Sequence, residues 1–176
     1  EMNDEPRGLS VAFREKGLRH GIVAEETLAN DLLGRRDLVR DPIRPLFYAS
    51  LATNVGGLGS PVVAIDPMQG LVGSPLWSGG GPGRLAVSPD GQYLYIGLDE
   101  TRAVQRIHLP TGTPDQRFAV PANGTVADMA VSPTNAGLVV LRRSPGGRTT
   151  LFDNGVARPN ELSGYEDLFA FSDTTA

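Results

Sequence analysis

The sequence predicts an all-β protein built from repeated four-stranded antiparallel units. Three segments with one plan support this: residues 41–51, 88–98 and 132–142 each begin with a polar residue and a proline, turn, and enter a short apolar strand. Their prolines, Pro42, Pro89 and Pro133, stand 47 and 44 residues apart. Proline at the second position favours a type I turn, so each segment is expected to be a turn followed by a strand.

Three further strands accompany each of these segments. An apolar strand precedes it, at 37–40, 84–87 and 128–131, and a third strand closed by a turn follows, at 62–70, 103–112 and 149–155. A weaker outer strand comes next, at 71–77 and 116–120 in the first two repeats. Four short strands in roughly 40 to 47 residues is the period of a β-propeller blade. We therefore predict three blades, over 37–80, 81–122 and 123–163, and the first strand of a fourth at 164–176.

The second repeat also resembles a known family. Residues 85–112, LAVSPDGQYLYIGLDETRAVQRIHLPTG, are similar to the YVTN-type (lactonase-like) β-propeller repeats of bacterial exported and surface proteins, and residues 41–51 and 62–70 match the preceding blade of such proteins. The resemblance covers about residues 37–176. It implies a bacterial protein that is exported to the periplasm, the medium or the cell surface.

An open set of about three blades is incomplete, because complete propellers of this kind usually have about seven. The chain is then a piece of a longer protein, or two copies complete one ring as a homodimer, or residues 1–36 cap the open blades. The first explanation is favoured. Residues 1–36 lack the pattern of a blade. Residues 8–23 are consistent with a hairpin and residues 24–34 with a short helix. This segment is therefore expected to be a linker or a cap, and the linker is preferred.

Composition excludes several classes of function. The chain has no cysteine, which excludes thiol catalysis, disulfides and cysteine-ligated metals. A net charge of −4 argues against a nucleic-acid partner, although Arg142, Arg143 and Arg148 predict a small basic patch at a blade edge. No apolar run approaches the ~18 residues of a membrane span. No catalytic residue, metal ligand or cofactor is assigned, because none of the common catalytic or phosphate-binding motifs is present.

One charged constellation follows the repeat. Asp37, Arg84 and Asp128 each stand five residues before the repeat proline, at the start of the innermost strand. Equivalent positions become neighbours around a propeller axis, so these residues are expected to line one end of the central channel. There they would bind a cation or a small polar ligand, or, as the favoured alternative, link adjacent blades. Asp99 and Glu100 fall in a turn and are expected to be solvated.

The predicted function is a non-catalytic binding or scaffolding module, which presents blade loops to a protein or glycan partner. The alternative, implied by the resemblance, is a lactonase-like hydrolase or a quinone-dependent dehydrogenase whose site is completed by missing blades or by a second chain. A lactonase needs a metal or a general base near the channel, and a quinoprotein needs residues that clamp a planar cofactor. The sequence offers only a sparse set of such residues, which favours the binding module.

Overall fold

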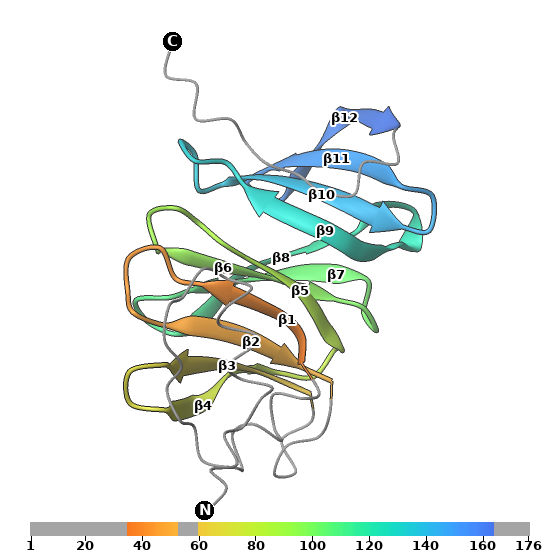
Figure 1. Cartoon of the computed structure of the whole chain (residues 1–176). Helices are drawn as coiled ribbons and strands as arrows, with labels where there is room; N and C mark the ends of the chain where they lie inside the picture. The colour runs from red at the N-terminus through yellow and green to blue at the C-terminus, as the bar shows by residue number, and fades with distance from the viewer. Residues whose placement is uncertain (1–34, 53–59, 164–176) are drawn as a thin grey trace, which may run out of the picture.

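A computed structural model describes residues 35–52 and 60–163 of the chain. These residues form twelve strands in three four-stranded antiparallel sheets, and each sheet follows the order of the sequence (Figure 1). One short 3-10 helix, Pro121–Asn123, precedes the third sheet. The predicted all-β fold with four-stranded blades is therefore confirmed. The predicted first strand of a fourth blade, at 164–176, and residues 1–34 lie outside the described residues.

The three sheets are called blades 1, 2 and 3, each beginning with its inner strand. Blade 1 consists of β1 (Arg35–Arg40), β2 (Phe47–Leu51), β3 (Pro61–Asp66) and β4 (Leu71–Ser78). Blade 2 consists of β5 (Pro82–Val87), β6 (Tyr93–Leu98), β7 (Ala103–His108) and β8 (Thr113–Ala119). Blade 3 consists of β9 (Thr125–Val131), β10 (Leu138–Ser144), β11 (Arg148–Asp153) and β12 (Val156–Ser163).

The blades stack face to face, with blade 2 between the other two (Figure 1). The inner strands lie side by side, because β5 contacts both β1 and β9. Figure 1 shows the sheets fanning out from this inner edge toward β4, β8 and β12. This arrangement brings the starts of the three inner strands close together, which is where the sequence predicts the charged constellation.

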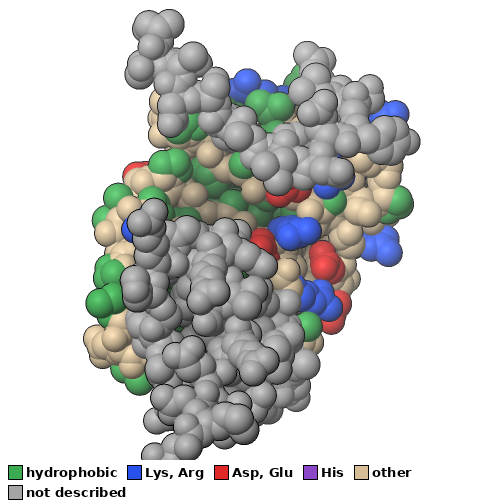
Figure 2. Space-filling view, viewed as in Figure 1, with side chains coloured by type: hydrophobic (Ala, Val, Ile, Leu, Met, Phe, Trp, Pro, Cys, Tyr) green, Lys and Arg blue, Asp and Glu red, His purple; other side chains and the backbone are tan. Residues whose placement is uncertain are grey.

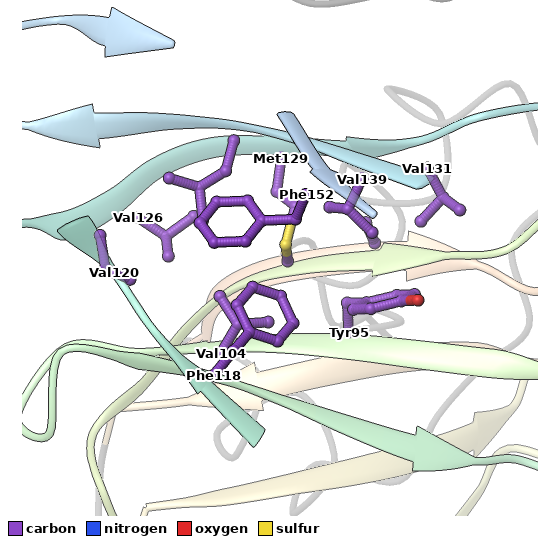
Figure 3. Packing of buried hydrophobic residues seen from close by; sticks show 11 residues of the cluster. Tyr95, Val104, Phe118, Val120, Val126, Met129, Val131, Val139 and Phe152 are labelled. Atoms are coloured by element: carbon purple, nitrogen blue, oxygen red, sulfur yellow. The ribbon is translucent and has the colours of Figure 1, made fainter. Parts of the chain in front are cut away.

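The core lies between the blades, and strand alternation assigns side chains to it. On β6, Leu94 and Ile96 pack toward blade 1, whereas Tyr95, between them, packs toward blade 3. The cluster between blades 1 and 2 contains Tyr48, Val62, Leu85, Leu94, Ile96, Leu98 and Ile107. In the cluster between blades 2 and 3 (Figure 3), the rings of Phe118 and Phe152 face each other with centroids 4.7 Å apart. Strands buried on both faces are expected to be apolar throughout, as β6 is.

The two ends of the stack differ in their loops. The antiparallel order places the turns after the first and third strand of every blade at one end, named here the proline end because Pro42, Pro89 and Pro133 lie there. Hydrogen bonds tie successive blades together at this end: the Arg44 Nη2 donates to the Gly91 carbonyl at 3.1 Å, and the Tyr95 hydroxyl donates to the Ala136 carbonyl at 2.7 Å. The inner strands begin at the opposite end. Within the described residues, no helix has the length and apolar character that crossing a membrane requires.

Candidate functional site

The predicted site residues lie at the opposite end, close to the start of the inner strands. Asp37, Arg84 and Asp128 occupy equivalent positions on β1, β5 and β9. In all three blades the pairing between the first and second strand is interrupted there: the register shifts between Arg35 and Asp37, between Pro82 and Leu85, and opposite Arg142 and Arg143. A β-bulge redirects the side chains beside it, so a repeated irregularity places the three residues.

Asp37 joins blade 1 to blade 2 through its carboxylate. One oxygen, Oδ1, accepts the backbone N–H of Leu38 at 2.9 Å, and the other, Oδ2, accepts the backbone N–H of Leu85 in the next blade, also at 2.9 Å. Both oxygens are therefore engaged by the backbone. The Nη1 of Arg84 lies 4.0 Å from Oδ1, and because the Arg84 side chain is half exposed this ion pair adds little stability.

Arg84 continues the linkage to blade 3. Its Nε donates to the carbonyl of Ala127 on β9 at 2.9 Å, across the bulge that precedes Asp128. Asp128 bonds within its own blade, where Oδ1 accepts the N–H of Met129 at 2.9 Å. The structure thus brings Asp37 and Arg84 together and connects Arg84 to the strand of Asp128. It gives Asp37 and Arg84 the blade-linking bonds of the favoured alternative.

One acidic residue and one arginine near this end, Asp99 and Arg36, were not recognised as part of the constellation. Asp99, in the turn after β6, pairs with Arg36, whose Nη1 lies 3.2 Å from Oδ2. The Oδ1 of Asp99 is buried and has no hydrogen-bond partner among the residues that the structure describes. Burial raises the pKa of Asp99 above its ordinary value, although the charges of Arg36 and Arg84 act in the opposite direction. Asp99 is therefore half-buried rather than fully solvated, with 33% of its side chain exposed, whereas Glu100 is exposed as expected.

This charged surface is mixed rather than acidic. Figure 2 shows basic and acidic side chains next to one another, beside a hollow whose coloured surface is largely hydrophobic and uncharged. Among the residues that the structure describes, no group of three or more His, Asp or Glu side chains is arranged to hold a metal ion. The contacts of Asp37, Arg84 and Asp99 consist of ion pairs and bonds to backbone atoms, which fix the spacing of the inner strands.

A second polar cluster lies at the proline end and was not predicted. The Asp41 side chain is fully buried, and its Oδ2 accepts the Tyr48 hydroxyl at 2.7 Å and the Arg44 Nη1 at 2.8 Å. Its Oδ1 accepts the backbone N–H groups of Ile43 and Arg44, each at 2.9 Å. Burial disfavours the charged carboxylate, but these hydrogen bonds outweigh it and hold the pKa of Asp41 below its ordinary value. Burial and the bond to Asp41 raise the pKa of Tyr48 to about 12.

The repeat itself carries the signal that would have revealed this cluster. Asp41 stands where the other two blades have Ser88 and Ser132, and all three side chains are buried. An ionisable residue in place of a buried serine needs extra donors, and Tyr48 and Arg44 supply them.

The predicted basic patch is wrong for two of its three members. Arg142 and Arg143 lie on β10, which is paired on both sides by β9 and β11, so they are not at a blade edge. Arg143 is buried and Arg142 is half-buried, whereas Arg148, at the start of β11, is exposed. The consecutive arginines were assigned by charge alone, which does not distinguish the end of a second strand from an outer edge.

Exposed hydrophobic side chains mark the proline end. Five large hydrophobic side chains are exposed in the described part of the chain: Ile43, Met68, Leu71, Val72 and Val156. Ile43 lies in the β1–β2 turn and Met68 in the β3–β4 turn. The other three begin β4 and β12, directly after turns at the same end. All five therefore share one end of the stack.

Comparison with known proteins identifies the fold. No family model and no curated protein matches the sequence. Among solved structures, the chain is similar to the hydrazine synthase of Kuenenia stuttgartiensis, with a TM-score of 0.59 and 18% identity over 80% of this chain and 36% of that one. It is also similar to the WD40 repeats of RRP9, with a TM-score of 0.58 and 14% identity over 76% and 40% of the two chains. The chain is similar, too, to the β-propeller domain of Myceliophteria thermophila Cps50 (Swd1). The TM-score is 0.57, and the identity is 15% over 82% of this chain and 39% of that one.

These similarities, together with the blade topology, define the chain as a partial β-propeller. It spans between 36% and 40% of the length of the three solved chains. Sequence identities below 20% support a shared fold, but they do not show a shared activity or a shared partner.

Proposed function

We propose that the chain is a non-catalytic binding or scaffolding module of a β-propeller protein, and that its proline end docks a protein partner. The observation that carries this proposal is the position of the exposed hydrophobic side chains. Ile43, Met68 and Val156 are each more than 60% exposed, and they stand on different turns or strand starts of the same end. Single exposed apolar side chains are ordinary on protein surfaces, but several of them at the same end of the stack, four on blade 1 and one on blade 3, favour an interaction surface there.

The rigidity of this end supports a docking role. The Arg44–Gly91 and Tyr95–Ala136 bonds hold the turns of successive blades in fixed positions. Ile43 also packs close to Gly91 of the next blade, where an added Cβ would come within 2.8 Å of the Ile43 side chain. A surface that is ordered before binding loses little conformational entropy on association.

The resemblance of residues 85–112 to YVTN-type repeats supports the finer part of the proposal. The parent protein is then a bacterial protein exported to the periplasm, the medium or the cell surface, and a glycan is the second kind of partner to consider. Aliphatic side chains such as Met68 and Leu71 favour a protein over a glycan, because glycan sites usually present polar and aromatic groups to the sugar.

Site-specific photo-crosslinking tests the docking surface. A benzophenone amino acid at Met68 is expected to give one defined protein adduct when the full parent protein is expressed in its own host. The same probe at Thr101, an exposed position in the β6–β7 turn at the opposite end, is the matched control and should give none. The Met68 adduct should be lost in an Ile43→Ser/Val156→Ser background. An adduct at Thr101 alone, or none at Met68, would contradict the proposal.

The enzymatic alternative has its own test. A lactonase-like hydrolase or a quinone-dependent dehydrogenase would contain a stoichiometric metal or a quinone chromophore. Metal analysis and the visible absorption spectrum of the purified parent protein therefore discriminate between the classes. A stoichiometric metal or a quinone band would overturn the binding-module proposal.

A ligand at Asp37, Arg84 and Asp128 stays a prediction. A cation would have to compete with the backbone N–H groups of Leu38 and Leu85 for the Asp37 carboxylate. Asp128 is therefore the better candidate ligand for a cation. Calorimetric titration of Ca²⁺ into the protein and into Asp128→Ala tests it, and binding that survives unchanged in the variant would remove the site.

A further inference from the structure

Met68 lies in the turn between β3 and β4, and its side chain faces solvent. It is 74% exposed, more than any other large hydrophobic side chain in the described part of the chain. The turn that carries it is held by Asp66, whose Oδ1 accepts the backbone N–H groups of Met68 at 2.8 Å and of Gln69 at 3.1 Å. An aspartate that bonds the backbone two residues on fixes the turn, so the thioether of Met68 is displayed from an ordered position at the proline end.

The chemistry of Met68 differs from that of the other exposed hydrophobic side chains at this end. The other four are saturated hydrocarbons, which peroxides leave unchanged, whereas a thioether is converted to a sulfoxide. The chain has no cysteine and three methionines, so methionine sulfur is its most readily oxidised group. Met129 is 7% exposed within the cluster between blades 2 and 3, and Met2 lies outside the described residues. Of the two described methionines, Met68 is therefore the one that an oxidant in solution reaches.

We propose that Met68 is a modification site for peroxides, and that its oxidation weakens docking at the proline end. The second part rests on the proposed docking function. In the reaction, a lone pair of the Met68 sulfur attacks one oxygen of hydrogen peroxide, the S–O bond forms and the O–O bond breaks. The proton of the transferred oxygen passes to the departing hydroxide, which leaves as water. The sulfur loses two electrons to the peroxide, and the product is methionine sulfoxide.

Oxidation changes the property of Met68 on which docking depends. The unmodified side chain is apolar and flexible, so it adapts to the apolar surface of a protein partner. The sulfoxide is polar, and its oxygen loses hydrogen bonds to water when an apolar partner covers it. Docking is therefore expected to weaken by about tenfold on oxidation. Methionine sulfoxide reductases reverse the reaction, so the loss of docking is expected to be reversible.

The first test measures the modification without any partner. The purified protein is treated with dilute hydrogen peroxide, and the oxidation of each methionine is followed with time by peptide mass spectrometry. Met68 is expected to react about tenfold or more faster than Met129, which is reached only when the stack opens locally. In denaturant, where both thioethers are exposed, the two rates should converge. Equal rates in the folded protein would overturn the modification site.

The second test measures docking. The parent protein, with a benzophenone amino acid at Leu71, is oxidised, freed of peroxide, mixed with an extract of its own host and irradiated. The yield of the partner adduct is expected to fall about tenfold on oxidation and to recover after treatment with methionine sulfoxide reductases. Met68→Leu keeps an apolar side chain without a thioether, so peroxide should not change its yield.

Three outcomes would contradict the proposal at different points. An undiminished yield after oxidation, or an equal fall in Met68→Leu, would overturn the effect of Met68 oxidation on docking. Absence of the adduct before oxidation would overturn the docking surface itself, and with it this effect. The oxidation rates of Met68 and Met129 decide the modification site independently of both.

Discussion

At the scale of single residues, the polar residue before each repeat proline is a structural anchor of its turn. The backbone N–H of Ser88 donates to the Tyr93 carbonyl, and the N–H of Tyr93 donates back to the Ser88 hydroxyl at 2.9 Å. Ser132 likewise closes its turn onto Leu138. A buried polar side chain is tolerated only where it finds partners, so these side chains stabilise the turn instead of facing solvent.

Asp41 is the charged version of this anchor, and its bond to Tyr48 gives the first prediction. Tyr48→Phe removes one donor from a fully buried carboxylate and is expected to lower the free energy of unfolding by about 1–2 kcal/mol at pH 7. The pKa of Tyr48 is raised from 10.0 to about 12 in the folded protein, so the unfolded chain releases this proton first as the pH rises. The stabilisation is complete below pH 10 and is lost as the pH rises toward 12.

Denaturant unfolding of the two proteins between pH 7 and 12 measures this difference. The advantage of the wild type over Tyr48→Phe should shrink as the pH rises above 10 and should be lost as the pH approaches 12. Tyr93→Phe is the control, because it also removes a tyrosine hydroxyl. It keeps the aromatic ring, whose centroid lies 4.2 Å from the Cζ of Arg106. A constant difference between wild type and Tyr48→Phe across the whole range would contradict the assigned pKa of Tyr48.

For single residues, the sequence predicted the positions of the site residues but not the contacts that they make. The period placed Asp37, Arg84 and Asp128 at equivalent positions, because equal spacing from a proline carries over directly to equal height on an inner strand. It did not reveal that Asp37 bonds to Leu85 or that Asp99 pairs with Arg36, since these contacts join residues 48 and 63 positions apart. Contacts between blades depend on how two sheets approach each other, which local patterns do not encode.

At the scale of elements, strands were predicted well and their irregularities were not. Apolar runs bounded by Pro and Gly turns indicate strands reliably, and each described strand overlaps a segment expected from the sequence or completes its blade. The bulges near the starts of β1, β5 and β9 left no such signal. They follow from the need to fit one twisted inner strand against the next, which is a property of the packed blades.

Gly97 on β6 shows how closely two blades approach, and it gives the second prediction. A Cβ at this position would lie 2.9 Å from the Cβ of Val126 on β9. Because this neighbour is a buried, stiff side chain, Gly97→Ala is expected to force the blades apart and to cost about 1–3 kcal/mol in the free energy of unfolding. Gly73→Ala is the matched control: its Cβ would meet its closest neighbour, the Ala64 carbonyl oxygen, at the ordinary distance of 3.5 Å.

Thermal or denaturant unfolding checks this prediction. Gly73→Ala should be neutral or slightly stabilising, since alanine reduces the entropy of the unfolded chain. The double variant Gly97→Ala/Val126→Ala should recover part of the loss, because the smaller side chain at 126 makes room for the new methyl group. Equal effects of Gly97→Ala and Gly73→Ala would show that β6 and β9 are not closely packed.

At the scale of the whole molecule, blade 2 is the shared member of both cores. Leu94, Ile96 and Ile107 belong to the cluster with blade 1, whereas Tyr95 and Val104 belong to the cluster with blade 3. In a linear stack, each unit is stabilised by its neighbours, so the central unit has two stabilising interfaces and each end unit has one among the described blades. The stack is therefore expected to open from its ends.

Phe152→Ala tests this nearest-neighbour behaviour. Phe152 on β11 is 2% exposed and packs on Phe118 of blade 2, so its removal leaves a cavity at the interface and is expected to cost about 3–5 kcal/mol. Native-state hydrogen exchange should then show the largest acceleration in β9, β10 and β11, a smaller one in β6 and β7, and little change in β1, β2 and β3. Val156→Ala, at an exposed position of the same blade, should leave all rates unchanged. Equal acceleration across the three blades would mean that they unfold as a single cooperative unit, and the nearest-neighbour description would then fail.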